Sequence, residues 1–307
     1  MKSVFLKLFS SIPNPRSLIY NPFIVIIPLL LLFSNCNNDK NNKPNTVSLF
    51  NKDGNDATYD TLDIGMQTIE VTGVKVDIAV PDGKVNGDIL VLPGWNFSKD
   101  KWCSDSDLCA KALAKGYRLI MPEMGLSVYA THYFPQTRAD WANAPTGVWV
   151  ADTLIRYLQG NYNVLSLKSR NFIVGLSTGG RGVVMTALRT GTLFKAGASL
   201  SGDFDQSQTP YDAVMTGFYG SYDEFRDLWE NTDNPIREAA KLKVPLYLGH
   251  GLQDYIVPNE QTQSFYKKLK EYNPGLKVVM HLSDTGMHDF NYWNTEVDPL
   301  LNFFDEF

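Results

Sequence analysis

The stretch that decides the fold of this 307-residue chain is Asn171-Phe172-Ile173-Val174-Gly175-Leu176-Ser177-Thr178-Gly179. It begins as an apolar, strand-like run and ends in the pentapeptide G-x-S-x-G, and the next three residues, Gly180-Arg181-Gly182, suit a tight helix start. A serine on a sharp turn between a strand and a helix is pushed clear of the backbone, and the flanking glycines leave room for that turn. The pattern predicts Ser177 as a nucleophile.

Short apolar runs alternate with helical stretches on both sides of this turn. We expect strands at 89–92, 117–121, 172–176, 194–200, 244–249 and 276–282, and helices at 108–114, 147–158 (ended by Gly160), 259–272 and from the serine to Gly191. Continuous apolar runs between helices are typical of strands buried on both faces of a parallel sheet. Residues 74–80 instead alternate apolar with polar, which predicts an antiparallel edge strand. The fold class is therefore α/β.

Two aromatic-rich insertions, about 123–146 and 203–243, interrupt this alternation. In the second, Ser221-Tyr222-Asp223-Glu224 has the form of a capping box that would start a helix, and Pro235 can open another short helix. We expect the insertions to cap the catalytic end of the sheet, with most of their aromatic side chains packing them onto the body.

A nucleophilic serine needs a base, which is normally a histidine held by a carboxylate. Among the 4 histidines, His288 directly follows the last predicted strand, where a loop can bring it over the serine. Asp254 lies in the loop after the preceding strand and gives the chain order Ser, Asp, His that this strand–turn–helix motif uses. Asp203 is the alternative acid, although an aspartate after a strand often only caps the next helix. His250 is expected to make local hydrogen bonds.

The tetrahedral intermediate of acyl transfer needs hydrogen-bond donors for its oxyanion, and backbone N–H groups can supply them. One donor is expected from Thr178, the residue after the nucleophile. The other is expected from the turn Pro93-Gly94-Trp95-Asn96, which follows the 89–92 strand. Trp95 is the first choice there and Asn96 the second.

With these motifs, residues 70–307 resemble the α/β-hydrolase superfamily. Leu92-Pro93-Gly94-Trp95 resembles the family's His-Gly oxyanion turn with proline in place of histidine, Pro122-Glu123-Met124-Gly125-Leu126-Ser127 is similar to the turn after the next strand, and Gly175–Gly179 matches the nucleophile elbow. The resemblance implies an eight-stranded, mostly parallel sheet flanked by helices, with a cap over Ser177. It implies no substrate, because one fold hosts many activities.

Residues 1–35 have the form of a lipoprotein-type signal peptide, with a basic start and an apolar run too short to span a bilayer. Leu32-Phe33-Ser34-Asn35-Cys36 resembles a bacterial lipobox, with Asn35 in place of the usual small residue. This resemblance implies lipid modification of Cys36. Residues 37–45 are rich in Asn and Lys and contain no apolar residue, which predicts a flexible tether over 36–57, and the hydrolase domain is expected over 58–307. The alternatives are a secretory peptide cut elsewhere or an uncleaved apolar anchor. We expect an exported protein, lipid-anchored to the membrane of the bacterial cell envelope.

The charge, the motifs and the cysteines limit which partners and cofactors are expected. The formal net charge is −5 at pH 7, and the sequence shows no run of Lys and Arg that could bind phosphates, so nucleic acid is not expected as a partner. No motif for a metal or a nucleotide is present, so no cofactor is expected. Cys103 and Cys109 could form a disulfide in an oxidising compartment, or could remain thiols if one helix holds their Cα atoms too far apart.

These features together predict a serine hydrolase that cleaves carboxylic esters of small-molecule acyl substrates through an acyl-enzyme. A peptidase or an acyl transferase of the same fold is the alternative. A catalytically silent surface module that binds a ligand in its aromatic cap is a third reading. The acyl group, the leaving group and the oligomeric state stay open.

Overall fold

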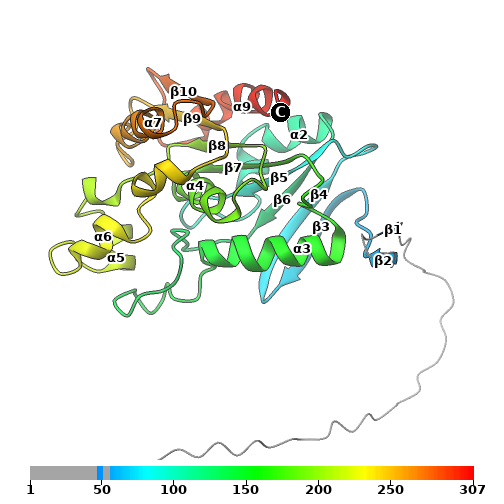
Figure 1. Cartoon of the computed structure of the whole chain (residues 1–307), viewed down its shortest axis with the longest axis horizontal. Coiled ribbons are helices and arrows are strands. Elements are labelled where there is room, and N and C mark those ends of the chain that lie inside the picture. Colours follow the sequence, from blue (N-terminus) through cyan, green and yellow to red (C-terminus); the bar gives the residue numbers. More distant parts are fainter. Residues whose placement is uncertain (1–46, 51–55) are drawn as a thin grey trace, which may run out of the picture. The chain divides into compact units, whose positions relative to one another are not determined.

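The computed structural model describes residues 47–50 and 56–307 (Figure 1). The predicted signal peptide, Cys36 and most of the predicted tether lie outside the described residues. The tether's predicted span nevertheless includes strand structure, because β1 (Val47–Phe50) pairs antiparallel with β2 (Asp56–Tyr59). Within the described ranges, no helix has the length and apolar character needed to cross a membrane.

An eight-stranded sheet forms the centre of the fold, in the order β10-β9-β8-β7-β5-β6-β4-β3. In chain order its strands are β3 (Gly65–Val71), β4 (Val74–Val80), β5 (Gly87–Leu92), β6 (Tyr117–Pro122), β7 (Asn171–Leu176), β8 (Ala196–Leu200), β9 (Leu246–Gly251) and β10 (Val278–Ser283). Strands β5 to β10 are parallel, whereas β3 and β4 run antiparallel to their neighbours. The predicted α/β-hydrolase sheet is confirmed.

Strand β4 is antiparallel as predicted, but the prediction that it forms the edge is wrong. Strand β3 pairs along its whole length, from Gly65 opposite Val80 to Val71 opposite Val74. The tight turn between them uses two positive φ angles, 49° at Thr72 and 85° at Gly73. Because β3 is largely exposed and carries no continuous apolar run, its sequence does not stand out as a strand.

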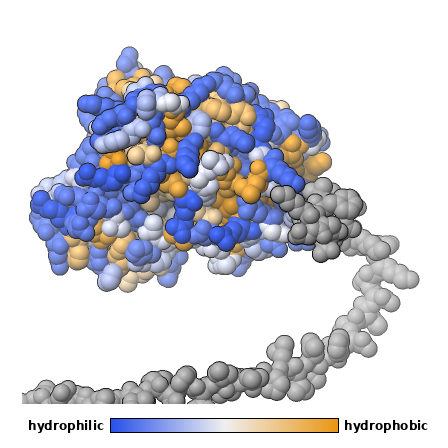
Figure 2. Space-filling view, viewed as in Figure 1, coloured by the Kyte–Doolittle hydropathy of each residue, from blue (hydrophilic) through white to orange (hydrophobic). Residues whose placement is uncertain are grey.

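Helices cover both faces of the sheet. One face is covered by α3 (Ile155–Tyr162), α4 (Thr178–Thr190) and α7 (Glu260–Tyr272), and the other by α1 (Lys101–Asp105), α2 (Leu108–Ala114), α8 (Phe290–Thr295) and α9 (Val297–Asp305). Strand residues alternate between the two cores, so that Ile173 of β7 joins the first and Phe172 the second. On the face shown in Figure 2, hydrophilic residues cover most of the surface and hydrophobic ones lie in scattered groups.

The helix predicted over 147–158 begins with a π-helical stretch, η1 (Trp149–Leu154), which continues into α3. Gly160 does not end it. The helix runs to Tyr162 and stops at Asn163, which takes the left-handed conformation with φ of 53°. Asparagine tolerates that conformation better than most residues, so it can serve as the stop in place of glycine.

The two insertions pack against each other. The second contains η2 (Gln206–Gln208), α5 (Ala213–Tyr219), α6 (Arg226–Asn231) and η3 (Pro235–Lys241), of which α5 and α6 lie to one side of the sheet in Figure 1. A separate hydrophobic cluster joins the insertions and buries Val128, Ala130, Met215, Phe218, Tyr219 and Trp229. Most of the insertion aromatics therefore serve packing, as expected.

The predicted capping box at Ser221–Glu224 does not form. Helix α6 starts at Arg226, and its N-cap is Phe225, which makes no capping hydrogen bond with its side chain. Phe225 packs against the insertion cluster, and this packing sets where the helix begins. Pro235 does open η3 at its first turn, as its sequence position indicates.

A disulfide joins Cys103 of α1 to Cys109 of α2, with Cα atoms 5.1 Å apart. The helical conformation is interrupted between α1 and α2 at Ser106, whose backbone is extended with φ of −146° and ψ of 168°. A single helix through both cysteines would hold the sulfur atoms apart, and this break removes that obstacle.

Removing this crosslink should lower stability. The Cys103→Ser/Cys109→Ser variant is expected to lose about 2 kcal/mol of unfolding free energy, because the disulfide restrains a short loop in the unfolded chain. Urea denaturation measures this, and the wild type in reducing agent should match the double variant. Equal stability of the oxidised wild type and the double variant would contradict the crosslink.

Candidate active site

Ser177 sits at the carboxyl end of β7, between β5 and β8, and caps α4. Its φ of 54° and ψ of −127° lie in a region that residues other than glycine rarely adopt. The Ser177 N–H donates to the Leu200 carbonyl at 2.9 Å, which holds the turn against β8. This is the strained elbow that the pentapeptide predicts.

Close backbone approach explains both glycines of the pentapeptide. A Cβ on Gly175 would collide with the backbone oxygen of Gly179. A Cβ on Gly179 would lie 2.5 Å from the carbonyl oxygens of both Leu92 and Pro93. The elbow is therefore packed directly against the turn that follows β5, and the missing side chains bring Ser177 beside that turn.

The loops after β9 and β10 bring Asp254 and His288 together. The Nδ1 atom of His288 lies 2.7 Å from Oδ2 of Asp254, whose carboxylate is buried. Oδ1 of Asp254 accepts hydrogen bonds from the N–H groups of Ile256 and Val257, each at 2.9 Å. Burial acts to raise the pKa of Asp254, but hydrogen bonds from His250 and His288 outweigh it and hold that pKa well below its usual range. Asp254 therefore stays ionised at neutral pH.

His250 lies near the end of β9 and holds this loop in place through local hydrogen bonds, as predicted. Its ring is fully buried, with Nδ1 2.7 Å from the Thr262 hydroxyl and Nε2 2.9 Å from the Val257 carbonyl. Nε2 also lies 3.3 Å from Oδ2 of Asp254. Both ring nitrogens are therefore occupied by structural contacts.

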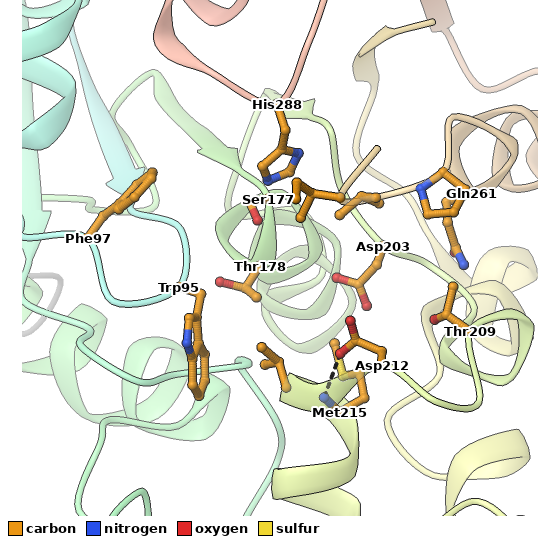
Figure 3. Close-up of a pocket in the computed structure, with 14 residues that line it drawn as sticks. Trp95, Phe97, Ser177, Thr178, Asp203, Thr209, Asp212, Met215, Gln261 and His288 are labelled. Carbon is orange, nitrogen blue, oxygen red and sulfur yellow. Dashed lines mark hydrogen bonds between the residues drawn. The ribbon is translucent and has the colours of Figure 1, made fainter. Parts of the chain in front are cut away.

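Ser177 and His288 line one cavity of about 230 Å³, and Figure 3 shows the His288 ring beside Ser177. The other residues lining it are Trp95, Phe97, Thr178, Asp203, Thr209, Asp212, Val214, Met215, Ile256, Val257, Pro258 and Gln261. The cavity opens at the carboxyl ends of the parallel strands, where α/β sheets bind ligands.

The backbone amides of Trp95 and Thr178 are available as oxyanion donors. The Asn96 N–H, the second choice in that turn, donates to the Gly125 carbonyl at 2.8 Å and is therefore occupied. The Trp95 N–H meets no acceptor within the described chain. Thr178 is the first residue of α4, where N–H groups have no partner inside the helix. Both residues also line the cavity.

Tyr129, in the first insertion, holds the turn that follows β5, and no sequence pattern singles it out. Its hydroxyl donates to the Pro93 carbonyl at 2.7 Å, and its side chain is fully buried. The ring packs against Gly182 of α4, where a Cβ would lie 2.6 Å from a ring carbon. Gly182, near the start of the helix after the elbow, is the one sequence signal that a large side chain packs there.

Asp203, the alternative acid, pairs with Arg181 rather than with His288. The Arg181 guanidinium is fully buried and lies 3.1 Å from Oδ2 of Asp203. Burial raises the pKa of Asp203, and the Arg181 charge opposes this. Arg181 also donates to the Gln206 side chain at 2.9 Å and to the Asp233 carbonyl. It therefore joins α4 to the second insertion.

The remaining histidines lie away from the cavity. His132 is exposed in the first insertion, and His281 in β10 places Nδ1 2.8 Å from the buried Glu296. Among the described residues, no group of three or more His, Cys, Asp and Glu side chains is arranged to hold a metal ion.

Comparisons with known proteins agree with this architecture. The family model described as Peptidase S9, prolyl oligopeptidase family, matches residues 153–307. An acetyl esterase of Caldicellulosiruptor saccharolyticus is 26% identical over 164 residues, which cover 48% of this chain and 59% of that protein. The match thus spans little more than half of the relative's length.

Solved structures resemble the chain in fold. The fluorophosphonate-binding serine hydrolase F of Staphylococcus aureus superposes with a TM-score of 0.62 at 17% identity, over 78% of this chain and 96% of that one. An acylaminoacyl peptidase of Pyrococcus horikoshii gives a TM-score of 0.60 at 17% identity, over 80% of this chain and 42% of that one. At these identities the likeness shows the fold alone.

Substitution of the two candidate acids should separate catalysis from stability. Asp254→Asn is expected to lower kcat by about 10³-fold to 10⁴-fold with the fold retained, because the histidine loses its orienting carboxylate. Asp203→Asn is expected to cost about 3–5 kcal/mol of unfolding free energy, because it leaves the buried Arg181 charge unpaired.

Ester kinetics and urea denaturation of both variants measure these effects. A stable Asp203→Asn protein with the larger loss in kcat would reverse the assignment of the acid.

Proposed function

The chain belongs to the prolyl oligopeptidase family and is a serine hydrolase, and on this basis we propose that it cleaves carboxylic esters through an acyl-enzyme. The observation that carries the proposal is the strained elbow that presents Ser177 to the same cavity as His288, whose ring is hydrogen-bonded to Asp254. Nucleophile, base and acid then come from the ends of three strands of one sheet.

In the proposed mechanism, Ser177 Oγ attacks the ester carbonyl carbon while Nε2 of His288 takes the hydroxyl proton. The hydrogen bond at 2.7 Å from Nδ1 to Asp254 holds the ring in position and stabilises the positive charge that forms on it. The Trp95 and Thr178 amides hold the developing oxyanion. His288 returns the proton to the leaving alkoxide, which departs as an alcohol.

Hydrolysis of the acyl-enzyme repeats these steps with water. His288 removes a proton from the water as its oxygen attacks the acyl carbon, and then protonates Ser177 Oγ as the carboxylic acid leaves. The same two amides serve both tetrahedral intermediates, because the acyl carbonyl keeps its place in the oxyanion site.

The size of the cavity favours small esters. A volume of about 230 Å³ is below the range of typical pockets for drug-sized ligands, which begins near 300 Å³. The similarity to an acetyl esterase also supports a short acyl group. The family name and the similarity in fold to an acylaminoacyl peptidase favour the second candidate, a peptidase.

A substrate panel tests the choice. Nitrophenyl acetate and butyrate are expected to be hydrolysed faster than the octanoate, and aminoacyl nitroanilides to be poor substrates. Ser177→Ala should reduce ester turnover by about 10³-fold or more, whereas the exposed Ser104→Ala serves as the matched control and should match the wild type. Cleavage of anilides but not esters would instead establish the peptidase.

We also propose that the chain is exported and lipid-anchored through Cys36, on the strength of the lipobox-like sequence. Mass spectrometry of the protein from a bacterial membrane fraction should show a mature N-terminus at Cys36 that carries acyl groups. The Cys36→Ser variant should then leave that fraction. An unmodified Cys36 inside a longer chain would contradict the anchor.

A further inference from the structure

Two carboxylates that the proposed mechanism does not use line the active-site cavity. Figure 3 shows Asp203 and Asp212 facing each other, on the opposite side of Thr178 from Trp95. No lysine or arginine lines this cavity. Apart from the catalytic groups, much of the remaining wall is apolar, with Trp95, Val214, Met215, Ile256, Val257 and Pro258. The cavity therefore combines acidic groups with an apolar wall.

Only one of the two carboxylates has a basic partner. Asp203 is offset by the buried Arg181 guanidinium at 3.1 Å. Asp212 forms no ion pair with any described lysine or arginine. Burial raises the pKa of Asp203, the Arg181 guanidinium lowers it, and the charge of Asp212, which faces Asp203 in Figure 3, raises it further. The cavity therefore carries an excess of negative charge.

The geometry of Asp212 leaves one oxygen free for a ligand. As the N-cap of α5, it accepts the Met215 N–H on Oδ1 at 2.8 Å. Oδ2 accepts no hydrogen bond from a described residue. Thr178, which lies between the two aspartates and Trp95, is 6% exposed, and its hydroxyl, on the side of Trp95 in Figure 3, has no partner among the described groups. A buried hydroxyl without a partner marks a place for a polar ligand group.

We propose that this part of the cavity is a subsite for a positively charged group of the substrate, which makes cationic esters the favoured substrate class. The proposal rests on the proposed ester hydrolysis at Ser177. An ammonium group would meet the free oxygen of Asp212 and would be attracted by its charge. A carboxylate in the same place would be repelled by Asp212 and would find no basic side chain along the wall.

Charge alone can be tested with isosteric substrates in which carbon replaces nitrogen. Acetylthiocholine and 3,3-dimethylbutyl thioacetate place the trimethyl group in the leaving group. The nitrophenyl esters of 4-(trimethylammonio)butanoate and 5,5-dimethylhexanoate place it in the acyl group. The readout is the ratio of kcat/KM for the cationic over the neutral member of each pair, because steps common to both substrates cancel.

In at least one pair, the wild type is expected to favour the cation by about tenfold or more, the effect of one nearby charge that is partly shielded from water. Asp212→Asn should bring that ratio close to one, and Asp212→Ser should do the same while keeping a capping side chain. Asp223→Asn removes one exposed charge from the same insertion and should leave the ratio at the wild-type value.

The outcomes separate the subsite from the proposed function. Equal turnover of both members of both pairs, or a cation preference that survives in Asp212→Asn and Asp212→Ser, would overturn the subsite and leave ester hydrolysis standing. No hydrolysis of any neutral or cationic ester, with nitroanilides cleaved, would overturn both. A preference lost in both Asp212 variants and kept in Asp223→Asn supports the subsite.

Discussion

The active site depends on one close contact, in which the backbone of the elbow lies against the turn after β5. Gly179 has no room for a side chain beside the Leu92 and Pro93 carbonyls, and Gly175 has none beside Gly179. This contact holds the start of α4 against the turn that carries Trp95, and both Trp95 and Thr178 line the cavity beside Ser177. The positive φ at Ser177 is the local strain that the packed β7–α4 unit maintains.

Arg181, one helical turn after Ser177, extends this rigidity to the insertions. Its buried guanidinium holds Asp203, Gln206 and the Asp233 carbonyl of the second insertion. The Asp233 carboxylate in turn accepts the Thr131 N–H of the first insertion at 2.9 Å. The buried Arg181 guanidinium therefore helps to position both insertions, and with them the part of the cavity wall that carries Asp212.

Local sequence patterns predict the features that local sterics determine. The elbow, the parallel strands and the loops holding Asp254 and His288 follow from apolar runs, glycines and chain order. Features set by long-range packing do not follow: β3 is recognisable only beside β4, and α6 starts where Phe225 packs rather than at Ser221. The role of Arg181 depends on partners far away in the chain, and the place of Asp212 in the cavity depends on how the second insertion packs over the sheet, so no spacing rule points to either.

The central claim is that the strained elbow makes Ser177 the reacting nucleophile of a serine hydrolase. Treatment of the folded protein with a fluorophosphonate probe, followed by mass spectrometry of the digested chain, tests it most directly. The account predicts one covalent adduct, on the peptide that contains Ser177, with stoichiometric loss of ester turnover. An adduct on another residue, or full turnover after complete labelling of Ser177, would contradict it.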